Sequence, residues 1–330
     1  MSENKTYTQM RNEFQNKLFT QIFPKIRHYE EERKSKKLLA ILLTTILTIL
    51  GIAFVIIAFY NFGREYTFKT CWLIAGFSFV VALSEIPFIK KKFENKIKDE
   101  IMPVVCSCFD GITWQQGHTD RTEEALENLD KIIFDSRLII KKSNKIVLDD
   151  KFLGCHNDVK YEITEGEFSI VEGCGKSRRE YTVFEGVVVK LEMNKNFTGN
   201  TIIDERGFSQ NFKYIDFDKS DLTKTTMEDV EFNKKYDVYT DDEVEARYLI
   251  TPSFMQRLKN MKGAFGANKI RCAFYKEYLL IGLFTSKDLF SICSLFEPID
   301  DPQQFFTMYE EIVSIIKLID HFKLDQKIGM

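Results

Sequence analysis

The sequence predicts an α+β protein, with an N-terminal two-helix transmembrane hairpin followed by a cytoplasmic domain of antiparallel strands and packing helices. Two long apolar stretches near the N-terminus, residues 38–60 and 70–89, predict the hairpin. Short alternating stretches separated by turn residues, between about residues 138 and 217, predict the antiparallel strands. The predicted domains are a cytoplasmic amphipathic helix at 1–37, the hairpin at 38–89 and the α+β domain at 90–330.

Each apolar stretch is long enough to cross a bilayer. Leu38–Tyr60 has 23 residues and no charge, and Thr70–Ile89 carries a single charged side chain, Glu85. A hydrocarbon core of about 30 Å needs roughly 20 apolar residues in a helix. The first stretch begins too late and runs too long for a cleaved signal peptide, so we expect a retained span.

The basic residues that flank the two stretches predict the orientation. The connecting loop contributes only Arg64 and Lys69, whereas the outer flanks carry Lys25, Arg27, Arg33, Lys34, Lys36, Lys37, Lys90, Lys91, Lys92, Lys96 and Lys98. Positive charge concentrates on the side that is not translocated. We therefore expect a multi-pass protein of the cell membrane with both termini in the cytoplasm and with membrane lipid as a partner.

The N-terminal segment, residues 3–37, carries one apolar stripe at helical spacing, interrupted by Pro24; its members are Tyr7, Met10, Phe14, Leu18, Ile22, Ile26 and Tyr29. The stripe could cover a membrane surface or a partner protein. It could equally pack on the protein's own soluble part, which is the interpretation we favour. Further on, Phe93, Ile97 and Ile101 continue a stripe from the second span and could run antiparallel to this helix, until Pro103 bends or ends it.

Glu85 is the intramembrane carboxylate of the predicted hairpin. Such a residue is a candidate for ion or proton transfer. It lies four residues before the end of the second span, however, where it can reach the headgroup layer or the Lys90–Lys92 cluster. A transport role would also require several chains to assemble.

Composition excludes some classes of protein. A formal net charge of -3 argues against a general nucleic-acid binder. Seven cysteines at irregular spacing favour free thiols over a disulfide framework. Six cysteine and histidine positions could gather around zinc, but none has the usual spacing of a ligand pair; they are Cys106, Cys108, His118, Cys155, His156 and Cys174. We predict no metal and no cofactor.

No motif identifies an enzyme. Gly173–Ser177 (GCGKS) resembles the end of a phosphate-binding loop, but Ile170 occupies the place of the first glycine and a strand follows, so a hairpin turn is the better interpretation. The acidic run at 241–245 next to Arg247 is typical of a solvated helix end. The sequence also contains no G-x-S-x-G, H-E-x-x-H or dinucleotide-binding fingerprint.

The C-terminal part predicts regular elements with clear boundaries. Thr251 caps a helix that begins at Pro252 and runs to Lys262. Lys269–Phe284 divides at Lys276–Glu277 into a hairpin, and Pro302 opens a last helix to about His321.

Three blocks carry a family resemblance: VFEGVVVKLEMNKNFTGNTII from Val183, EFNKKYDVYTDDEVEARYLITPSFMQRL from Glu231 and DLFSICSLFEPID from Asp288. They resemble a bacterial membrane-protein family catalogued as the domain of unknown function three-one-three-seven. The resemblance implies a bacterial inner-membrane location. Members of the family look similar to proteins often encoded beside LemA-type membrane proteins, which implies a possible membrane-protein partner. It implies no activity, cofactor or catalytic residue.

Within these blocks, Phe184, Phe197, Tyr248 and Leu249 are expected in the core, and Gly186 and Gly199 at close backbone approaches. Glu245 and Arg247 are the candidate interaction residues; two positions apart, they cannot face each other on one helix. We expect a membrane-anchored cytoplasmic module that binds a partner or senses the state of the envelope. The alternatives are an enzyme acting on a membrane-proximal or small cytoplasmic substrate, and an oligomeric transport component centred on Glu85.

Overall fold

The structure is a computed structural model that describes residues 6–61, 64–109, 111–117, 123–139, 142–193, 196–207 and 219–328. It divides into two compact units. Unit 1 comprises Met1–Met10, Cys106–Phe290 and Phe306–Met330, and unit 2 comprises Arg11–Val105 and Ser291–Phe305. The chain therefore passes between the units at four points, which a simple anchor followed by a separate domain would not require.

A long helix runs through the N-terminal region. It consists of α1 (Tyr7–Lys17), a π-helical turn η1 (Leu18–Ile22) and α2 (Phe23–Tyr60). The irregular turn lies just before Pro24, whose missing N–H disrupts the regular helical hydrogen bonds there. The predicted apolar stripe is buried within the protein from Met10 to Tyr29, as the favoured interpretation required.

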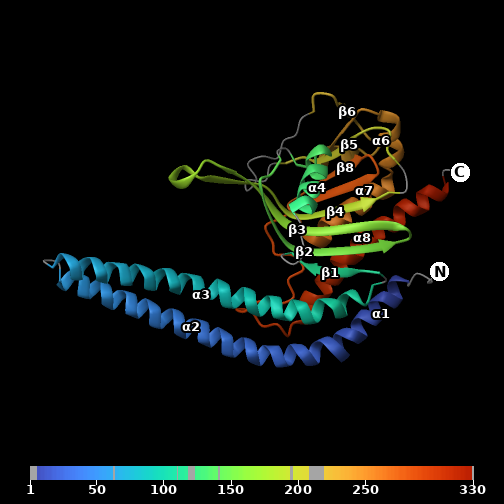
Figure 1. Cartoon of the computed structure of the whole chain (residues 1–330). Helices are drawn as coiled ribbons and strands as arrows, with labels where there is room; N and C mark the ends of the chain where they lie inside the picture. Colours follow the sequence, from blue (N-terminus) through green and yellow to red (C-terminus); the bar gives the residue numbers. More distant parts are fainter. Residues whose placement is uncertain are drawn as a thin grey trace. The chain divides into compact units, whose positions relative to one another are not determined.

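The second long helix, α3 (Glu65–Cys106), lies beside α2 and runs in the opposite direction (Figure 1). Cross-contacts follow this antiparallel register: Lys25 to Glu100, Glu32 to Lys96, and the rings of Phe59 and Trp72. Pro103 does not end α3, which continues to Cys106 although the proline has no N–H to donate to the carbonyl of residue 99.

One helix of the described residues, Tyr7–Tyr60, is long and apolar enough to cross a membrane. Its counterpart on α3 is a shorter apolar stretch, Tyr66–Val81. The side chains of residues 82–86, Glu85 among them, lie outside the described ones. The structure therefore supports one candidate span where the sequence predicted two.

Unit 1 is built on a nine-stranded sheet in the order β1-β2-β3-β4-β9-β8-β5-β7-β6, and every pairing of neighbouring strands is antiparallel. The α+β class with antiparallel strands is thus confirmed. The strands are β1 (Thr113–Gln116), β2 (Lys145–His156), β3 (Val159–Glu172), β4 (Arg179–Glu192), β5 (Thr201–Glu205), β6 (Thr223–Thr225), β7 (Tyr236–Thr240), β8 (Lys269–Tyr275) and β9 (Tyr278–Phe284).

The central strands are longer than the sequence predicted. The two alternating stretches at 160–163 and 168–171 are parts of the single strand β3, with Gly166 inside it. Bulges between Leu148 and Lys151 and between Phe168 and Ser169 shift the register, and each shift interrupts the period-two pattern. The GCGKS segment is the turn of the β3–β4 hairpin, which extends beyond the rest of the sheet (Figure 1).

Helices cover both faces of the sheet. The side of α4 (Glu123–Asp135) packs with Leu148, Phe168, Phe184 and Ala273 in one apolar cluster. On the opposite face α7 (Pro252–Phe265) contacts Phe274 through Phe254, and α8 (Pro302–Ile328) stacks Tyr309 on Phe109. The short helices α5 (Val230–Lys235) and α6 (Glu243–Leu249) flank β7 in the chain. The Thr251 cap and the β8–β9 hairpin are confirmed.

Residue-level expectations are mostly met. Phe184, Phe197 and Leu249 are buried, but Tyr248 is 55% exposed, so its assignment to the core is wrong. Gly186 has φ +138°, and a Cβ there would lie 2.0 Å from the Leu283 carbonyl oxygen of β9. No side chain fits this approach.

Candidate functional sites

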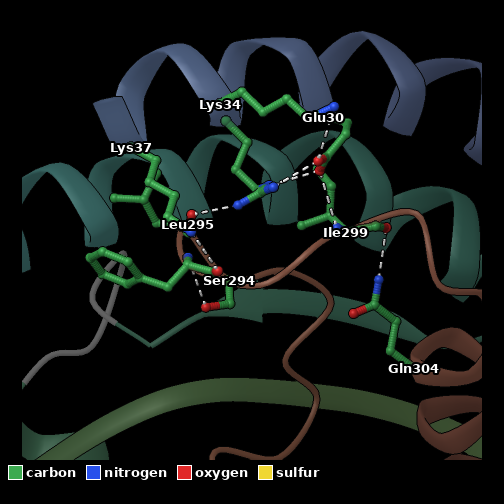
Figure 2. Close-up of polar contacts among 9 residues, drawn as sticks. Glu30, Lys34, Lys37, Ser294, Leu295, Ile299 and Gln304 are labelled. Atoms are coloured by element: carbon green, nitrogen blue, oxygen red, sulfur yellow. Dashed lines mark hydrogen bonds and ion pairs between the residues drawn. The ribbon is translucent and has the colours of Figure 1, made fainter. Parts of the chain in front are cut away.

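One candidate site of unit 2 is formed by α2 and the segment Ser291–Phe305, which we call the strap (Figure 2). Glu30 and Arg33 lie three residues apart on one face of α2 and are 8% and 5% exposed. Arg33 donates from Nε and Nη2 to the two carboxylate oxygens of Glu30, both at 2.7 Å. This bidentate geometry gives the strongest kind of side-chain ion pair.

Each partner of this pair also binds the backbone of the strap. Arg33 Nη1 donates to the Leu295 carbonyl oxygen at 2.9 Å, and the Ile299 N–H donates to Glu30 Oε2 at 3.3 Å. Lys37 adds a bond to the Phe296 carbonyl oxygen at 3.3 Å (Figure 2). The hydrogen bonds from Arg33 lower the pKa of the Glu30 carboxyl, against the opposing effect of burial. An ion pair thus holds the strap through hydrogen bonds from both of its side chains.

A second cluster lies in unit 1, where Asp320 of α8 meets the β2–β3 turn. His156 Nε2 lies 2.7 Å from Asp320 Oδ1, and the amide of Asn157 donates to the same oxygen. Tyr7 donates its hydroxyl proton to Asp320 Oδ2. Burial raises the pKa of Asp320, but the hydrogen bonds from His156 and Tyr7 outweigh it and the net shift is downward. Burial and the bond to Asp320 raise the pKa of Tyr7.

This second cluster contains the residue types of a general base, but its hydrogen bonds link three segments of the chain. Asp320 occupies Nε2 of His156 and both of its own oxygens are engaged. The arrangement fastens α1, the β2–β3 turn and α8 to one another. From the sequence, His156 is only a possible zinc ligand, because Asp320 lies more than 100 residues away in the chain.

Among the described residues, one group has the composition of a cation site: the carboxylates of Asp149, Glu165 and Asp288, whose oxygens lie within 4.8 Å of one another. An all-oxygen set suits Mg²⁺ or Ca²⁺. Glu165 Oε1 also accepts the Leu289 N–H at 2.7 Å, so this carboxylate orders the segment after β9. Cys106 and Cys108 are buried, and Cys155 and Cys174 are exposed.

The residues singled out by sequence are not brought together. Glu245 is buried and accepts the N–H groups of Thr198 and Gly199 at 2.9–3.0 Å, so it pairs with another segment. Arg247 lies 4.0 Å from Glu243 and 3.4 Å from the Thr225 hydroxyl, and about half of its side chain is exposed. Glu85 is in α3, and its side chain is not among the described ones.

The comparisons with known proteins agree with the resemblance seen in the sequence. The model of the family described as "Protein of unknown function (DUF3137)" matches residues 182–324. These residues comprise β4 to β9, the strap and most of α8. A search of curated proteins found no match. A solved structure, the mycobacterial trehalose monomycolate transport factor A (TtfA), aligns with 9% identity over 60% of this chain and 96% of its own, with a TM-score of 0.30.

Proposed function

We propose that this chain, whose residues 182–324 belong to the DUF3137 family, is a multi-pass protein of the bacterial inner membrane that binds a partner protein on the cytoplasmic side. In this proposal Leu38–Tyr60 and Thr70–Ile89 cross the membrane as a helical hairpin. The α+β domain and both termini are cytoplasmic. The role is non-catalytic.

The observation that carries the proposal is an inverted burial pattern in α2 and α3. Small residues are buried in the paired region, namely Ala40, Gly51, Ala58, Ala75 and Ser78. Large apolar residues point outward, with exposed fractions of 60% for Ile46, 61% for Ile49, 73% for Leu73 and 71% for Phe77. In water this surface would be strongly unfavourable, whereas small residues inside and large ones outside are typical of helices that pack in lipid.

The burial pattern changes where the apolar stretches end. Ile26 on α2 and Phe93, Ile97 and Ile101 on α3 are completely buried, as in a water-soluble helix pair. Lysines lie directly before the apolar stretch of α2 and directly after that of α3, whereas the connecting loop has few basic residues. This supports cytoplasmic ends for both helices.

A binding role is supported by the way the polar clusters are used. The hydrogen bonds of the Glu30–Arg33 pair and of the Asp320 cluster connect segments of the chain to one another. Ser291–Phe305 lies within the family's matched region and is held against the helix that precedes the first span. A partner bound to the domain can thereby be linked to the membrane helices.

The topology is tested with the chain's own exposed thiols, Cys155 and Cys174. A membrane-impermeant maleimide should leave both unlabelled in intact spheroplasts and label them after permeabilisation. In a Cys155→Ser/Cys174→Ser background, Arg64→Cys should be labelled in intact spheroplasts. Labelling of Cys174 before permeabilisation would refute the orientation.

The partner is tested on the full chain by chemical crosslinking in cells, followed by native mass measurement of the solubilised complex. The expected mass is a whole multiple of the chain mass of 38.7 kDa plus the mass of one further component. Masses that are only multiples of the chain would contradict partner binding.

A further inference from the structure

The loop end of the α2–α3 pair carries a group of aromatic side chains, which we call the aromatic belt; its members are Phe59, Tyr60, Tyr66, Phe68 and Trp72. Tyr60 and Tyr66 are 92% and 89% exposed, and Phe59 is 65% exposed. The ring of Trp72 lies edge-on to the rings of Phe59 and Phe68, each with its centroid 6.4 Å away. Both helices therefore contribute to one aromatic surface within unit 2.

We propose that the aromatic belt binds the layer of ester carbonyls and headgroups in the membrane leaflet opposite the α+β domain, and so fixes the depth of the helix pair. The inference rests on the proposed function, because it takes Leu38–Tyr60 and Thr70–Ile89 as the two spans. Anchoring requires only apolar length. The belt adds a surface that is specific for the interfacial layer of the lipid.

The belt contains the residue types that suit this layer. Trp and Tyr are enriched at membrane–water interfaces, because the ring leaves water while the indole N–H or the hydroxyl keeps a polar partner. Among the residues that the structure describes, none accepts a hydrogen bond from Trp72 Nε1 or from the hydroxyls of Tyr60 and Tyr66. Lipid ester and phosphate oxygens supply acceptors at the interface, whereas the hydrocarbon core supplies none.

The distance from the belt to the flanking lysines matches the thickness of one bilayer. At a rise of about 1.5 Å per residue, Phe59 stands about 33 Å from Lys37 along α2, and Trp72 about 27 Å from Lys90 along α3. The hydrocarbon core is about 30 Å thick. Because the rings of Phe59 and Trp72 are in contact, both helices place the outer edge of the core at the same level.

The surface next to the belt favours lipid over a partner protein as the occupant. The belt continues along the two helices into exposed apolar side chains, with exposed fractions of 63% for Ile56, 73% for Leu73 and 71% for Phe77. A bilayer presents the same sequence of environments, in which hydrocarbon adjoins an ester layer. One continuous occupant therefore covers the span and the belt.

The test measures the depth of Trp72 in the full chain, reconstituted in phosphatidylcholine vesicles that contain brominated phosphatidylcholine. Bromine quenches tryptophan fluorescence at close range. The chain has two tryptophans, so the difference between the wild type and Trp72→Phe isolates the signal of Trp72. Bromine near the glycerol end of the acyl chain should quench this signal about twice as strongly as bromine near the methyl end, as expected for an interfacial ring.

The matched control is the signal that remains in Trp72→Phe. It comes from Trp114 of β1, which donates to Asp150 Oδ1 and should be quenched by neither lipid label. Trp114→Phe leaves Trp72 as the single tryptophan and should reproduce the preference for the shallow label, which gives a second measurement should Trp72→Phe fold poorly.

Two outcomes would overturn the belt. Stronger quenching of Trp72 by the deep label would place its ring within the hydrocarbon core. Quenching by neither label would place it in water, where aqueous iodide quenches it, or beneath a protein, where iodide does not. Alkaline carbonate extraction separates this inference from the proposed function. If membranes retain the wild type, either outcome refutes the belt alone, whereas release of the wild type would refute both.

Discussion

Arg33 has the least replaceable side chain of the strap site, because it neutralises Glu30 and binds Leu295 at once. Arg33→Ala would leave a buried carboxylate without its counter-ion, which typically costs about 3–5 kcal/mol. We expect a loss of that size in the free energy of unfolding, measured by denaturation of the full chain in detergent. Lys34→Ala, at a side chain 69% exposed, should change it by less than about 0.5 kcal/mol. Equal effects of the two substitutions would show that the pair does not hold the strap.

The buried carboxyl group of Glu311 in α8 is expected to make the stability of the folded protein depend on pH. It is 3% exposed, and burial raises its pKa to about 8 despite the Phe290 N–H that it accepts and the nearby charge of Lys287. The folded protein therefore binds a proton that the unfolded chain has released above its ordinary pKa of about 4.3. Stability from this group is full below that value and declines as pH rises towards 8.

Glu311→Gln should remove this decline. The variant's melting temperature should exceed that of the wild type by a margin that grows from pH 5 to pH 8. A margin that is constant across this range would show that Glu311 is already ionised in the folded protein.

Substitutions of Glu245 and Arg247 are predicted to differ in their effect on stability, because Glu245 holds a loop and Arg247 is half exposed. Glu245→Ala would leave the Thr198 and Gly199 N–H groups without their acceptor, at about 1–3 kcal/mol for each buried donor. Arg247→Ala removes a half-exposed side chain and should cost less than about 0.5 kcal/mol. If denaturation shows the reverse order, the assignment of Glu245 to the loop is wrong.

At the scale of an element, the β4–β9 pairing depends on a glycine. Gly186→Ala would press a methyl group against the Leu283 carbonyl at an unfavourable φ and should lower the free energy of unfolding by about 3 kcal/mol. Gly263→Ala on α7 meets nothing within 4 Å and should stabilise by about 0.5–1 kcal/mol through helix propensity. Opposite signs are therefore expected in one unfolding assay, and two losses of similar size would contradict the close approach.

Elements with strong local signals were predictable from the sequence, and those with interrupted signals were not. Thr251–Pro252 supplies a cap and a first-turn proline, so the start of α7 is a local property. The extent of β3 is not local: its alternation is broken around Thr164–Gly166, and pairing with β2 and β4 continues the strand through this break. The π turn before Pro24 likewise depends on how the helix continues on both sides.

At the scale of the whole molecule, the effect of one substitution on membrane insertion depends on whether the helix pair lies in lipid or in water. Ile49 lies at the centre of Leu38–Tyr60 and is 61% exposed. In lipid, Ile49→Arg should cost about 2.5–3.5 kcal/mol of insertion, and the fraction resistant to alkaline extraction should fall. Val244→Arg, at a residue 81% exposed on α6, should leave that fraction unchanged. An unchanged fraction for Ile49→Arg as well would place this helix in water.

The sequence by itself determined the properties that local composition carries: the apolar stretches, the cap of α7, the β8–β9 hairpin, the antiparallel character of the sheet and the family resemblance. The tertiary structure decided which distant residues meet. Glu30 and Arg33 bind the strap, which lies more than 250 residues later in the chain. His156 gained its partner Asp320 in the same way. Contacts between residues so far apart leave no periodicity in a single sequence, because they depend on how whole elements pack.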